Sequence, residues 1–373
     1  MNIALIIWSN PEMYINLLFT AKKLLEKKNK VFLFCRGYPK NLRSFKYFNY
    51  FNKIQIISVP ETENKYLDKI NLLKLIFKSI YYIFNYKINL IIGYNFHGLL
   101  VAKINKIFRK KLKIIYHNFD FNEKDENNSQ IIQTFLTKKF LNNVIGVITP
   151  SKNRSRIFKK KYLLKSMPIS MLNSFPLDFK IKKKKFFNNR RLIIRLGTFN
   201  QFHSIENLIY SSKYLKNKYQ IIIAGKSYNN FYKKMKNIVI KNKLKNVTLL
   251  KNITYKYWFR LLSGADLGVA LYESINTSHE NMAGTSQKLN NYILANIPSI
   301  VNSTNEFVKF NRMYDISYLI KNDQPTQLAK KIKTIFRNKK LYNKKIKNNR
   351  ILFKKKLNFD YQFLKIVKLL NIN

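Results

Sequence analysis

Short apolar runs alternate with longer amphipathic segments along most of this chain. Asn2–Trp8, Lys30–Cys35 and Leu192–Leu196 are almost continuously apolar, which is typical of strands buried on both faces of a parallel sheet. Between such runs lie segments with helical periodicity, such as Tyr14–Lys27 and Ile205–Leu215. Because parallel strands need crossover connections, this alternation predicts an α/β fold built from doubly wound parallel sheets covered by helices.

The alternation is interrupted once. The segment FKIKKKKFFNNRR, residues 179–191, is short, charged and without periodicity. A chain of 373 residues is long enough for two domains. We therefore expect a Rossmann-like domain over residues 1–178, a basic linker over 179–191 and a second Rossmann-like domain over 192–356.

One stretch of the second half, Ala265–Ser303, combines a buried strand, a polar loop, a capped helix and another strand. The helix begins at Thr285 and Ser286, where unpaired backbone N–H groups and the positive end of the helix dipole favour a phosphate. The same pattern also fits an ordinary strand–helix–strand unit with a Ser/Thr cap.

The chain is strongly basic, with 71 Lys and Arg against 18 Asp and Glu and a formal net charge of +53. Such a surface attracts polyanions, which include anionic lipid, acidic glycans and nucleic acid. Aromatic residues make up 15% of the chain, which suits a nucleic-acid binder. However, the sequence has no helix-turn-helix, zinc-finger or RNP-like signature.

Cysteine and hydropathy patterns bear on the compartment. Cys35 is the only cysteine, so no disulfide can form within the chain, as expected for a reducing cytoplasm. No apolar run reaches the length of a membrane span, and the N-terminus reads as a strand rather than a signal peptide. Ile70–Phe84 predicts a basic amphipathic helix, which either covers the sheet or lies on anionic lipid.

The sequence lacks metal-ligand clusters, nucleophile motifs, the P-loop and GxGxxG. It does contain glycine turns after two predicted strands, at Gly197 and Gly225, where the backbone can approach a ligand closely. Lys226 follows the second turn and could meet a phosphate as a point charge.

All four histidines, His97, His117, His203 and His279, fall just after predicted strands. Ligands of open parallel sheets bind at the carboxyl ends of the strands. The shared placement therefore favours a ligand cleft, with four scattered core histidines as the alternative.

Several motifs of the second half occur together in one order: RLGTFNQFHSIENLIYSSKYL, YQIIIAGKS, LKNVTLLKNI, LLSGADLGVALY and TSQKLNNYILANIPSIVNS. Together they resemble the nucleotide-sugar domain of GT-B glycosyltransferases, close to glycosyltransferase family 4, the group 1 transferases that build polysaccharide and lipopolysaccharide. YNFHGLLVAKI, KIIYHNFDF and VIGVITPSKNRSRIFKK resemble acceptor-domain segments more loosely. NFDYQFLKIVKLL resembles the family's last helix, which implies that residues 357–373 pack back on the first domain.

The resemblance, together with the turn chemistry, implies roles for individual residues. His117 matches the histidine near the transferred sugar and is the catalytic candidate. Asn10 and His97 are assigned to the acceptor side. Nine residues are assigned to the donor diphosphate and nucleotide: Gly197, Thr198, His203, Gly225, Lys226, Thr285, Ser286, Lys288 and Asn291.

Some positions depart from the family pattern. Thr198 and His203 stand where an Arg and a Lys are usual, and Asn291 replaces the glutamate that binds the donor ribose. An amide oxygen accepts a hydrogen bond more weakly than a carboxylate does. The donor is therefore held differently, with Arg195 or Lys226 supplying charge, or activity is reduced.

The resemblance implies a retaining, metal-independent transfer, without a cofactor, from a nucleotide-diphosphate sugar to a glycan or lipid-linked acceptor in cell-surface polysaccharide or lipopolysaccharide synthesis. Together with the net charge, it implies a cytoplasmic protein held peripherally on the anionic inner face of the cell membrane. A polyanion-binding protein and a catalytically silent GT-B-like scaffold are the alternative interpretations.

Overall fold

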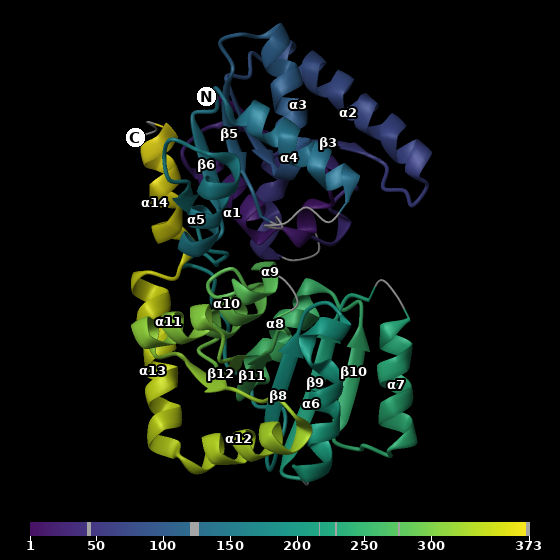
Figure 1. Cartoon of the computed structure of the whole chain (residues 1–373), viewed down its shortest axis with the longest axis vertical. Helices are drawn as coiled ribbons and strands as arrows, with labels where there is room; N and C mark the ends of the chain where they lie inside the picture. Colours follow the sequence, from purple (N-terminus) through teal and green to yellow (C-terminus); the bar gives the residue numbers. More distant parts are fainter. Residues whose placement is uncertain (43–45, 120–126, 216, 228–229, 275–276, 371–373) are drawn as a thin grey trace. The chain divides into compact units, whose positions relative to one another are not determined.

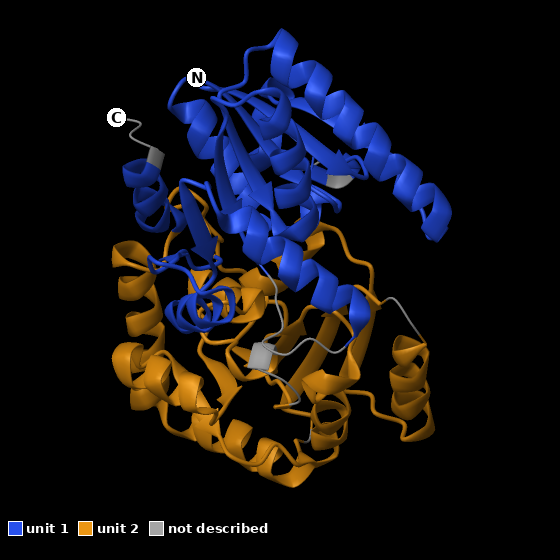
Figure 2. Cartoon of the chain, turned by 45° about the horizontal axis from the view of Figure 1, so that its top comes forward, with its two compact units in different colours: residues 1–173, 359–373 blue, residues 174–358 orange. Residues whose placement is uncertain are grey.

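The computed structural model describes residues 1–42, 46–119, 127–215, 217–227, 230–274 and 277–370. The chain divides into two compact units, residues 1–173 with 359–373, and residues 174–358 (Figure 2). Each unit is a parallel sheet covered by helices, so the predicted α/β fold with two Rossmann-like domains is confirmed (Figure 1). Residues 179–191 lie within the second unit, and residues 359–373 belong to the first.

The described part of unit 1 contains a seven-stranded parallel sheet in the order β3-β2-β1-β4-β5-β6-β7. Its strands are β1 (Asn2–Ile7), β2 (Lys30–Arg36), β3 (Gln55–Val59), β4 (Leu90–Tyr94), β5 (Lys113–His117), β6 (Gly146–Thr149) and β7 (Ile169–Ser170). The order turns back beside β1, so the strands next to β1 are β2 and β4, which pair with it in parallel. The carboxyl end of such a turning point is where open α/β sheets bind ligands.

Helices cover both faces of this sheet. They are α1 (Ile15–Glu26), α2 (Lys65–Asn85), α3 (Asn95–Phe108), α4 (Asn128–Leu141), α5 (Lys152–Tyr162) and α14 (Phe359–Leu370), with short 3-10 turns at Pro11–Met13, Lys40–Leu42 and Lys46–Lys53. Leu75 of α2, Leu99 of α3 and Phe158 of α5 pack into one apolar cluster with strand side chains. Within the same unit, α14 packs against α1, where the rings of Phe19 and Phe359 lie 5.6 Å apart.

The described part of unit 2 contains a six-stranded parallel sheet in the order β10-β9-β8-β11-β12-β13. Its strands are β8 (Arg191–Leu196), β9 (Tyr219–Gly225), β10 (Val247–Lys251), β11 (Leu267–Ala270), β12 (Ser299–Asn302) and β13 (Ser317–Ile320). The order again turns back beside the first strand of the unit, between β9 and β11, which places the ends of β8, β9 and β11 together.

The helices of unit 2 are α6 (Ile205–Ser211), α7 (Phe231–Lys241), α8 (Tyr255–Gly264), α9 (Thr277–Glu280), α10 (Gln287–Leu294), α11 (Asn305–Tyr314), α12 (Pro325–Arg337) and α13 (Lys339–Lys355), with 3-10 turns at Gln201–His203 and Ser212–Tyr214. Leu208 of α6, Met235 of α7 and Ile332 of α12 pack into the apolar cluster of this sheet. Residues 338–356 are rich in Lys and Asn, and the sequence pattern predicts no helix there, yet most of this segment forms α13.

No helix within the described ranges combines the length and hydropathy needed to cross a membrane. The longest helix, α2, buries Leu75, Ile76 and Ile83 and exposes its opposite face. α2 therefore covers the sheet, which is one of the two interpretations that the sequence of Ile70–Phe84 allowed.

Candidate functional site

Two glycine turns meet at the carboxyl ends of β8 and β9. Leu196 pairs with Ala224, and the N–H of Gly197 donates to the carbonyl of Ala224 at 2.9 Å. A Cβ on Gly225 would lie 1.8 Å from the carbonyl oxygen of Gly197, so only glycine fits there. Gly197 has φ +131°, a conformation that side chains disfavour. The two turns thus form one close-packed backbone surface at the end of the sheet.

Arg195 holds the first turn from within the sheet. Its side chain is 1% exposed and donates to the carbonyl oxygens of Gly197 and Thr198, both at 2.7 Å. Burial lowers the pKa of Arg195 to about 10, so the guanidinium remains charged at neutral pH. Its Nε has no hydrogen-bond partner among the described residues. A buried guanidinium that meets only neutral acceptors places an unbalanced positive charge beneath the loop.

His203 accepts the third hydrogen bond of Arg195. Nη2 of Arg195 lies 2.8 Å from Nδ1 of His203. A guanidinium can only donate, so Nδ1 is the acceptor and the ring proton is assigned to Nε2. Burial, followed by the charges of Lys288 and Arg195, lowers the pKa of His203 far below its ordinary value. His203 is therefore a neutral imidazole that can offer its Nε2–H to a ligand.

Lys288 brings a second buried basic side chain to the same place. Lys288 is 8% exposed, and its Nζ lies 4.3 Å from the ring centroid of Tyr272. Its side chain also covers Gly197, since a Cβ added there would lie 3.6 Å from Nζ. Burial and the neighbouring Arg195 hold the pKa of Lys288 well below its ordinary value. Within the described ranges, no carboxylate forms an ion pair with Lys288 or Arg195.

The start of α10 completes this arrangement. Ser286 is its N-cap, and its Oγ accepts from the N–H of Leu289 at 3.2 Å and lies 2.5 Å from the hydroxyl of Tyr272. The N–H groups of Thr285 and Ser286 both donate to the carbonyl of Met282, and the Thr285 hydroxyl also donates there. Both residues therefore lie at the helix start as predicted, but their polar groups stabilise the turn and the cap.

The first-turn N–H groups left for a ligand belong to other residues. Those of Gln287 and Lys288 form no hydrogen bond in the part of the chain that the structure describes. They are the N-terminal donors of an eight-residue helix, where the dipole favours an anion. Lys288 thus presents its backbone N–H group as well as its side-chain amine at the start of α10.

The amide of Asn291 is used within unit 2. Asn291 is 0% exposed and meets Trp258 of α8. With its amide oriented to satisfy its neighbours, it accepts from Trp258 Nε1 at 3.0 Å and donates to the carbonyl of Gln287 at 3.3 Å. Both polar atoms are thus used inside the unit, and a ribose contact, which stays a prediction, would require one of these bonds to open.

Other predicted donor-side residues lie at the rim. Thr198 is half-buried and contributes its carbonyl to Arg195, while Lys226 is exposed. The carbonyl of Lys226 accepts from the N–H of Phe199 at 2.7 Å, which ties the two glycine loops together. His279 lies beside His203, with ring centroids 5.7 Å apart, so two of the four predicted rim histidines are neighbours.

In unit 1, His117 ends β5 and is 0% exposed. Neither ring nitrogen has a hydrogen-bond partner among the described residues. Its ring packs against Tyr94 and Phe119, with centroids 5.1 and 4.5 Å away. Burial lowers the pKa of His117 to about 3, so the imidazole is neutral. Buried polar groups are rarely left without hydrogen-bond partners, and a polar ligand would satisfy the ring nitrogens of His117.

The predicted acceptor-side residues lie at the ends of neighbouring strands of this unit. Asn10 follows β1, and its Oδ1 accepts from the N–H of Glu12 at 3.0 Å. His97 lies in the first turn of α3, which directly follows β4, and its ring lies 6.3 Å from that of Trp8. Burial lowers the pKa of His97. The fold therefore brings Asn10 and His97 to one edge of the sheet.

From the sequence, we expected Arg195 only as a possible source of charge, and we did not single out Tyr272. The signal for Arg195 was present, since a charged residue interrupts the apolar run RLIIRL of a core strand. Tyr272 contacts His203, Lys288 and Ser286, which come from three different segments. Within the described ranges, no three His, Cys, Asp or Glu side chains lie close enough to hold a metal ion.

Comparisons with known proteins bear on both units. Residues 178–351 match the family described as glycosyl transferases group 1. No curated protein matches the sequence. The structure of HepE from Anabaena, in complex with UDP and glucose, is similar with a TM-score of 0.77 and 14% identity, over 100% of this chain and 99% of that one.

Two further structures are similar over the whole chain. Sucrose-phosphate synthase from Thermosynechococcus elongatus has a TM-score of 0.69 and 14% identity, over 100% of this chain and 98% of that one. The lipopolysaccharide outer core galactosyltransferase WaaB, in its apo form, has a TM-score of 0.59 and 10% identity, over 100% and 99%. At these identities the likeness shows the fold.

The fold places the chain in the GT-B class, with two Rossmann-like units. Residues 178–351 carry the match to the group 1 glycosyl transferases, and this match together with the fold supports a glycosyltransferase.

Proposed function

We propose that this glycosyltransferase moves a sugar from a nucleotide-diphosphate donor to a glycan or lipid-linked acceptor, with retention of configuration and without a metal ion or cofactor, in cell-surface polysaccharide or lipopolysaccharide synthesis. HepE, which has a similar fold, has been solved with UDP-glucose bound. UDP-linked sugars are therefore the first donors to test.

The observation that carries the proposal is the pair of buried basic side chains at the glycine turns. Arg195 and Lys288 are both buried, and neither has a carboxylate partner among the described residues. Buried charges need a partner of opposite sign, because desolvation strongly disfavours an isolated ion. A diphosphate fits this need, since it would meet the ammonium of Lys288, the N–H groups of Gln287 and Lys288 and the Nε2–H of His203.

The same groups would stabilise the reaction. When the sugar leaves the nucleotide, negative charge develops on the diphosphate, and fixed donors aimed at it lower the barrier. His117 is assigned to orienting the sugar, because its nitrogens are unsatisfied and its imidazole is neutral. Gly197 and Gly225 allow the backbone to approach the phosphates. In the proposed retaining course, the acceptor attacks on the face that the diphosphate leaves, and a diphosphate oxygen takes the acceptor proton.

The exposed face of α2 supports the proposal that the protein acts at an anionic membrane surface. Leu73, Phe77, Tyr81 and Phe84 are spaced along one side of α2 and are all exposed, Phe77 by 69%. Lysines of the same helix, such as Lys74, are also exposed. Apolar and aromatic side chains flanked by Lys suit the interface of an anionic bilayer. We therefore propose peripheral binding at the inner face of the cell membrane, where lipid-linked acceptors are reached.

The donor test is a thermal-shift panel of UDP-, GDP-, ADP- and TDP-sugars, with wild-type protein and with Lys288→Met. One nucleotide sugar should raise the melting temperature of the wild type, and the variant should respond less. Transfer of the sugar from that donor to acceptors extracted from membranes then tests turnover. Stabilisation only by RNA or DNA would favour the polyanion binder, and no response to any donor would favour the silent scaffold.

The membrane test is flotation with vesicles containing anionic or only zwitterionic lipid at low salt. Wild-type protein should float with the anionic vesicles, and Phe77→Ser with Tyr81→Ser should float less. Ile240→Ser is the matched control, since Ile240 is 62% exposed on α7 in unit 2. Wild-type protein that stays at the bottom of the gradient would contradict membrane binding.

A further inference from the structure

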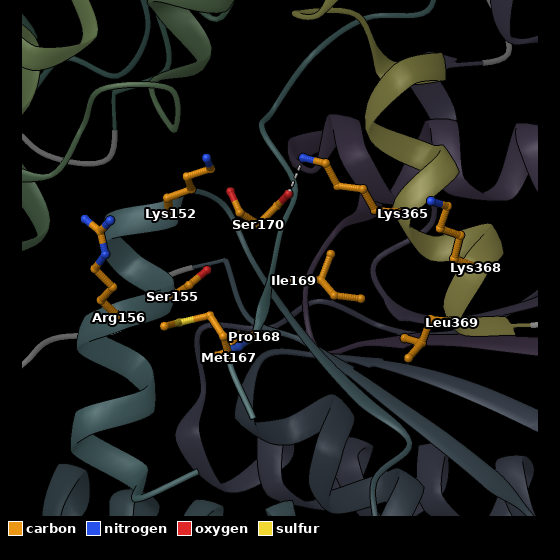
Figure 3. A pocket seen from close by; sticks show the side chains of 10 residues that line it. All are labelled: Lys152, Ser155, Arg156, Met167, Pro168, Ile169, Ser170, Lys365, Lys368 and Leu369. Carbon is orange, nitrogen blue, oxygen red and sulfur yellow. Dashed lines mark hydrogen bonds between the residues drawn. The ribbon is translucent and has the colours of Figure 1, made fainter. Parts of the chain in front are cut away.

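Unit 1 contains a pocket of about 640 Å³ that none of the predicted site residues lines. It lies between the first turns of α5, the strand β7 and the last turns of α14 (Figure 3). Its volume falls within the range of small-molecule sites. Its lining residues are Lys152, Ser155, Arg156, Met167, Pro168, Ile169, Ser170, Lys365, Lys368 and Leu369.

Four cations line this pocket from two helices. Lys152 and Arg156 come from α5, and Lys365 and Lys368 come from α14. The lining includes no acidic residue, and none of the four forms an ion pair among the described residues. Like charges held around one cavity repel each other, and a bound anion would remove this repulsion.

One of these cations is fixed in place. Nζ of Lys365 donates to the carbonyl of Ser170 at 2.7 Å (Figure 3). It also donates to Oε1 of Gln362 at 2.8 Å. Burial and the positive charge of Lys152 lower the pKa of Lys365. The ammonium of Lys365 therefore sits on the wall of the pocket with neutral acceptors only, as expected for a position that a ligand anion would complement.

The first turn of α5 adds to the positive potential. Ser151 caps this eleven-residue helix by accepting from the N–H of Arg154, and Lys152 and Arg156 lie one turn apart on it. The amino end of a helix carries a partial positive charge. Dipole and side chains thus act in the same direction on one side of the pocket.

The other part of the lining is apolar. Met167, Pro168, Ile169 and Leu369 contribute only hydrocarbon or thioether surface, and Met167 is 52% exposed. A monatomic or small inorganic anion would use the cations and leave this surface in contact with water. A ligand that combines an anionic group with an apolar chain would use both parts.

We propose that this pocket binds the phosphate group of a phosphorylated amphiphile. The side chains of Lys152, Arg156 and Lys368 hold the phosphate oxygens, and the apolar chain lies along Met167 and Leu369. All its lining residues belong to unit 1, and none of them is assigned to the donor.

The experiment is calorimetric titration at about 0.15 M salt, where general surface attraction is screened beyond about 8 Å. The probes are monomeric dihexanoylphosphatidic acid, inorganic phosphate and dihexanoylphosphatidylcholine. We expect the phosphatidic acid to bind about tenfold or more tightly than either other probe. The titration with inorganic phosphate distinguishes a free phosphate from a lipid phosphate. The titration with dihexanoylphosphatidylcholine tests whether binding needs a ligand with net negative charge.

Variants locate the binding. Lys152→Glu with Lys368→Glu should weaken phosphatidic acid binding about tenfold or more, because two attractive charges become repulsive. Lys110→Glu with Lys111→Glu, an exposed pair after α3, makes the same change in net charge outside the pocket and should leave binding unchanged. Met167→Ser should weaken the phosphatidic acid and not the inorganic phosphate.

Three results would overturn the proposal. Equal weakening by both charge-reversed pairs would show general attraction to the basic surface. Inorganic phosphate binding as tightly as phosphatidic acid would remove the apolar chain from the proposal. Unchanged binding in the variant with Lys152→Glu and Lys368→Glu would show that the phosphatidic acid does not bind in this pocket. Lys152 and Lys368 are both exposed, so the variant should fold, and its melting temperature is measured alongside.

Discussion

Nη2 of Arg195 lies 2.8 Å from Nδ1 of His203 and donates to it. This bond fixes the tautomer of His203 and links the end of β8 to the turn that follows it. It also means that the buried guanidinium faces an imidazole rather than a carboxylate, so its charge is available to an anion. The proposed donor site follows from this pairing together with Lys288.

Replacing Lys288 by Met keeps an unbranched side chain and removes the charge. Charge-assisted hydrogen bonds contribute about 1.5–3 kcal/mol, so nucleoside-diphosphate affinity should fall about 10- to 100-fold. Removing an unpaired buried charge should leave the unfolding midpoint unchanged or raise it. Calorimetry and urea unfolding measure the two effects. Lys241→Met, at an exposed lysine of α7 outside the assigned donor residues, is the control, and equal losses of affinity in both variants would contradict the role of Lys288.

His117→Ala should reduce turnover about 100-fold while nucleotide affinity changes little, because His117 is assigned to the sugar and not to the diphosphate. His117→Leu restores the lost volume and serves as the packing control. Both variants should lose turnover alike if the imidazole matters. Full activity of His117→Leu with the true substrates would remove His117 from the mechanism.

Stability should fall in acid. His117 and His203 have pKa values lowered by burial, to about 3 for His117, so the folded chain keeps them neutral while the unfolded chain protonates near pH 6.5. Their contribution is present above pH 6.5 and is lost as the pH falls from 6.5 towards 3, by at most about 1.4 kcal/mol per pH unit for each group. Urea midpoints at pH 7.5, 6 and 5 measure the slope. It should be shallower in His117→Leu, and a midpoint that rises on acidification would contradict the burial argument.

Gly225→Ala should destabilise unit 2 by about 3 kcal/mol or more, because the new Cβ would lie 1.8 Å from the carbonyl oxygen of Gly197 and the backbone must move. Gly37→Ala in unit 1 is the comparison. Gly37 has φ +78°, but its Cβ would meet the flexible side chain of Glu61 at 3.0 Å, so a loss of only about 1–2 kcal/mol is expected. Denaturant unfolding followed by fluorescence compares them, and similar losses would show that the two turns are not interlocked.

Asn291→Leu removes the acceptor for Trp258 Nε1 and should destabilise unit 2 by about 1–3 kcal/mol. If Asn291 also binds the ribose, the affinity for a nucleoside diphosphate should fall while the affinity for pyrophosphate stays the same. Unchanged affinity for both ligands would limit Asn291 to its structural bond with Trp258.

The segment Asn338–Lys356 illustrates why one helix was missed. Its composition of Lys and Asn carries little apolar periodicity, yet it forms α13. The helix is held by tertiary contacts, since buried Lys345 pairs with Asp315 and Asn349 donates to the carbonyl of Ile297 at 3.3 Å. Such contacts override local propensity and cannot be read from the segment itself.

The sequence by itself determined the fold class, because continuous apolar runs separated by amphipathic segments can be buried only as parallel strands between helices. It also placed Gly197, Gly225 and Ser286 at strand and helix ends, since these are local properties of the chain. Only the tertiary structure decided that Arg195, His203 and Lys288 converge, with no carboxylate paired to them among the described residues. That arrangement depends on which strand ends lie side by side and on burial, which sets the charge state of each group, and neither is encoded in local sequence.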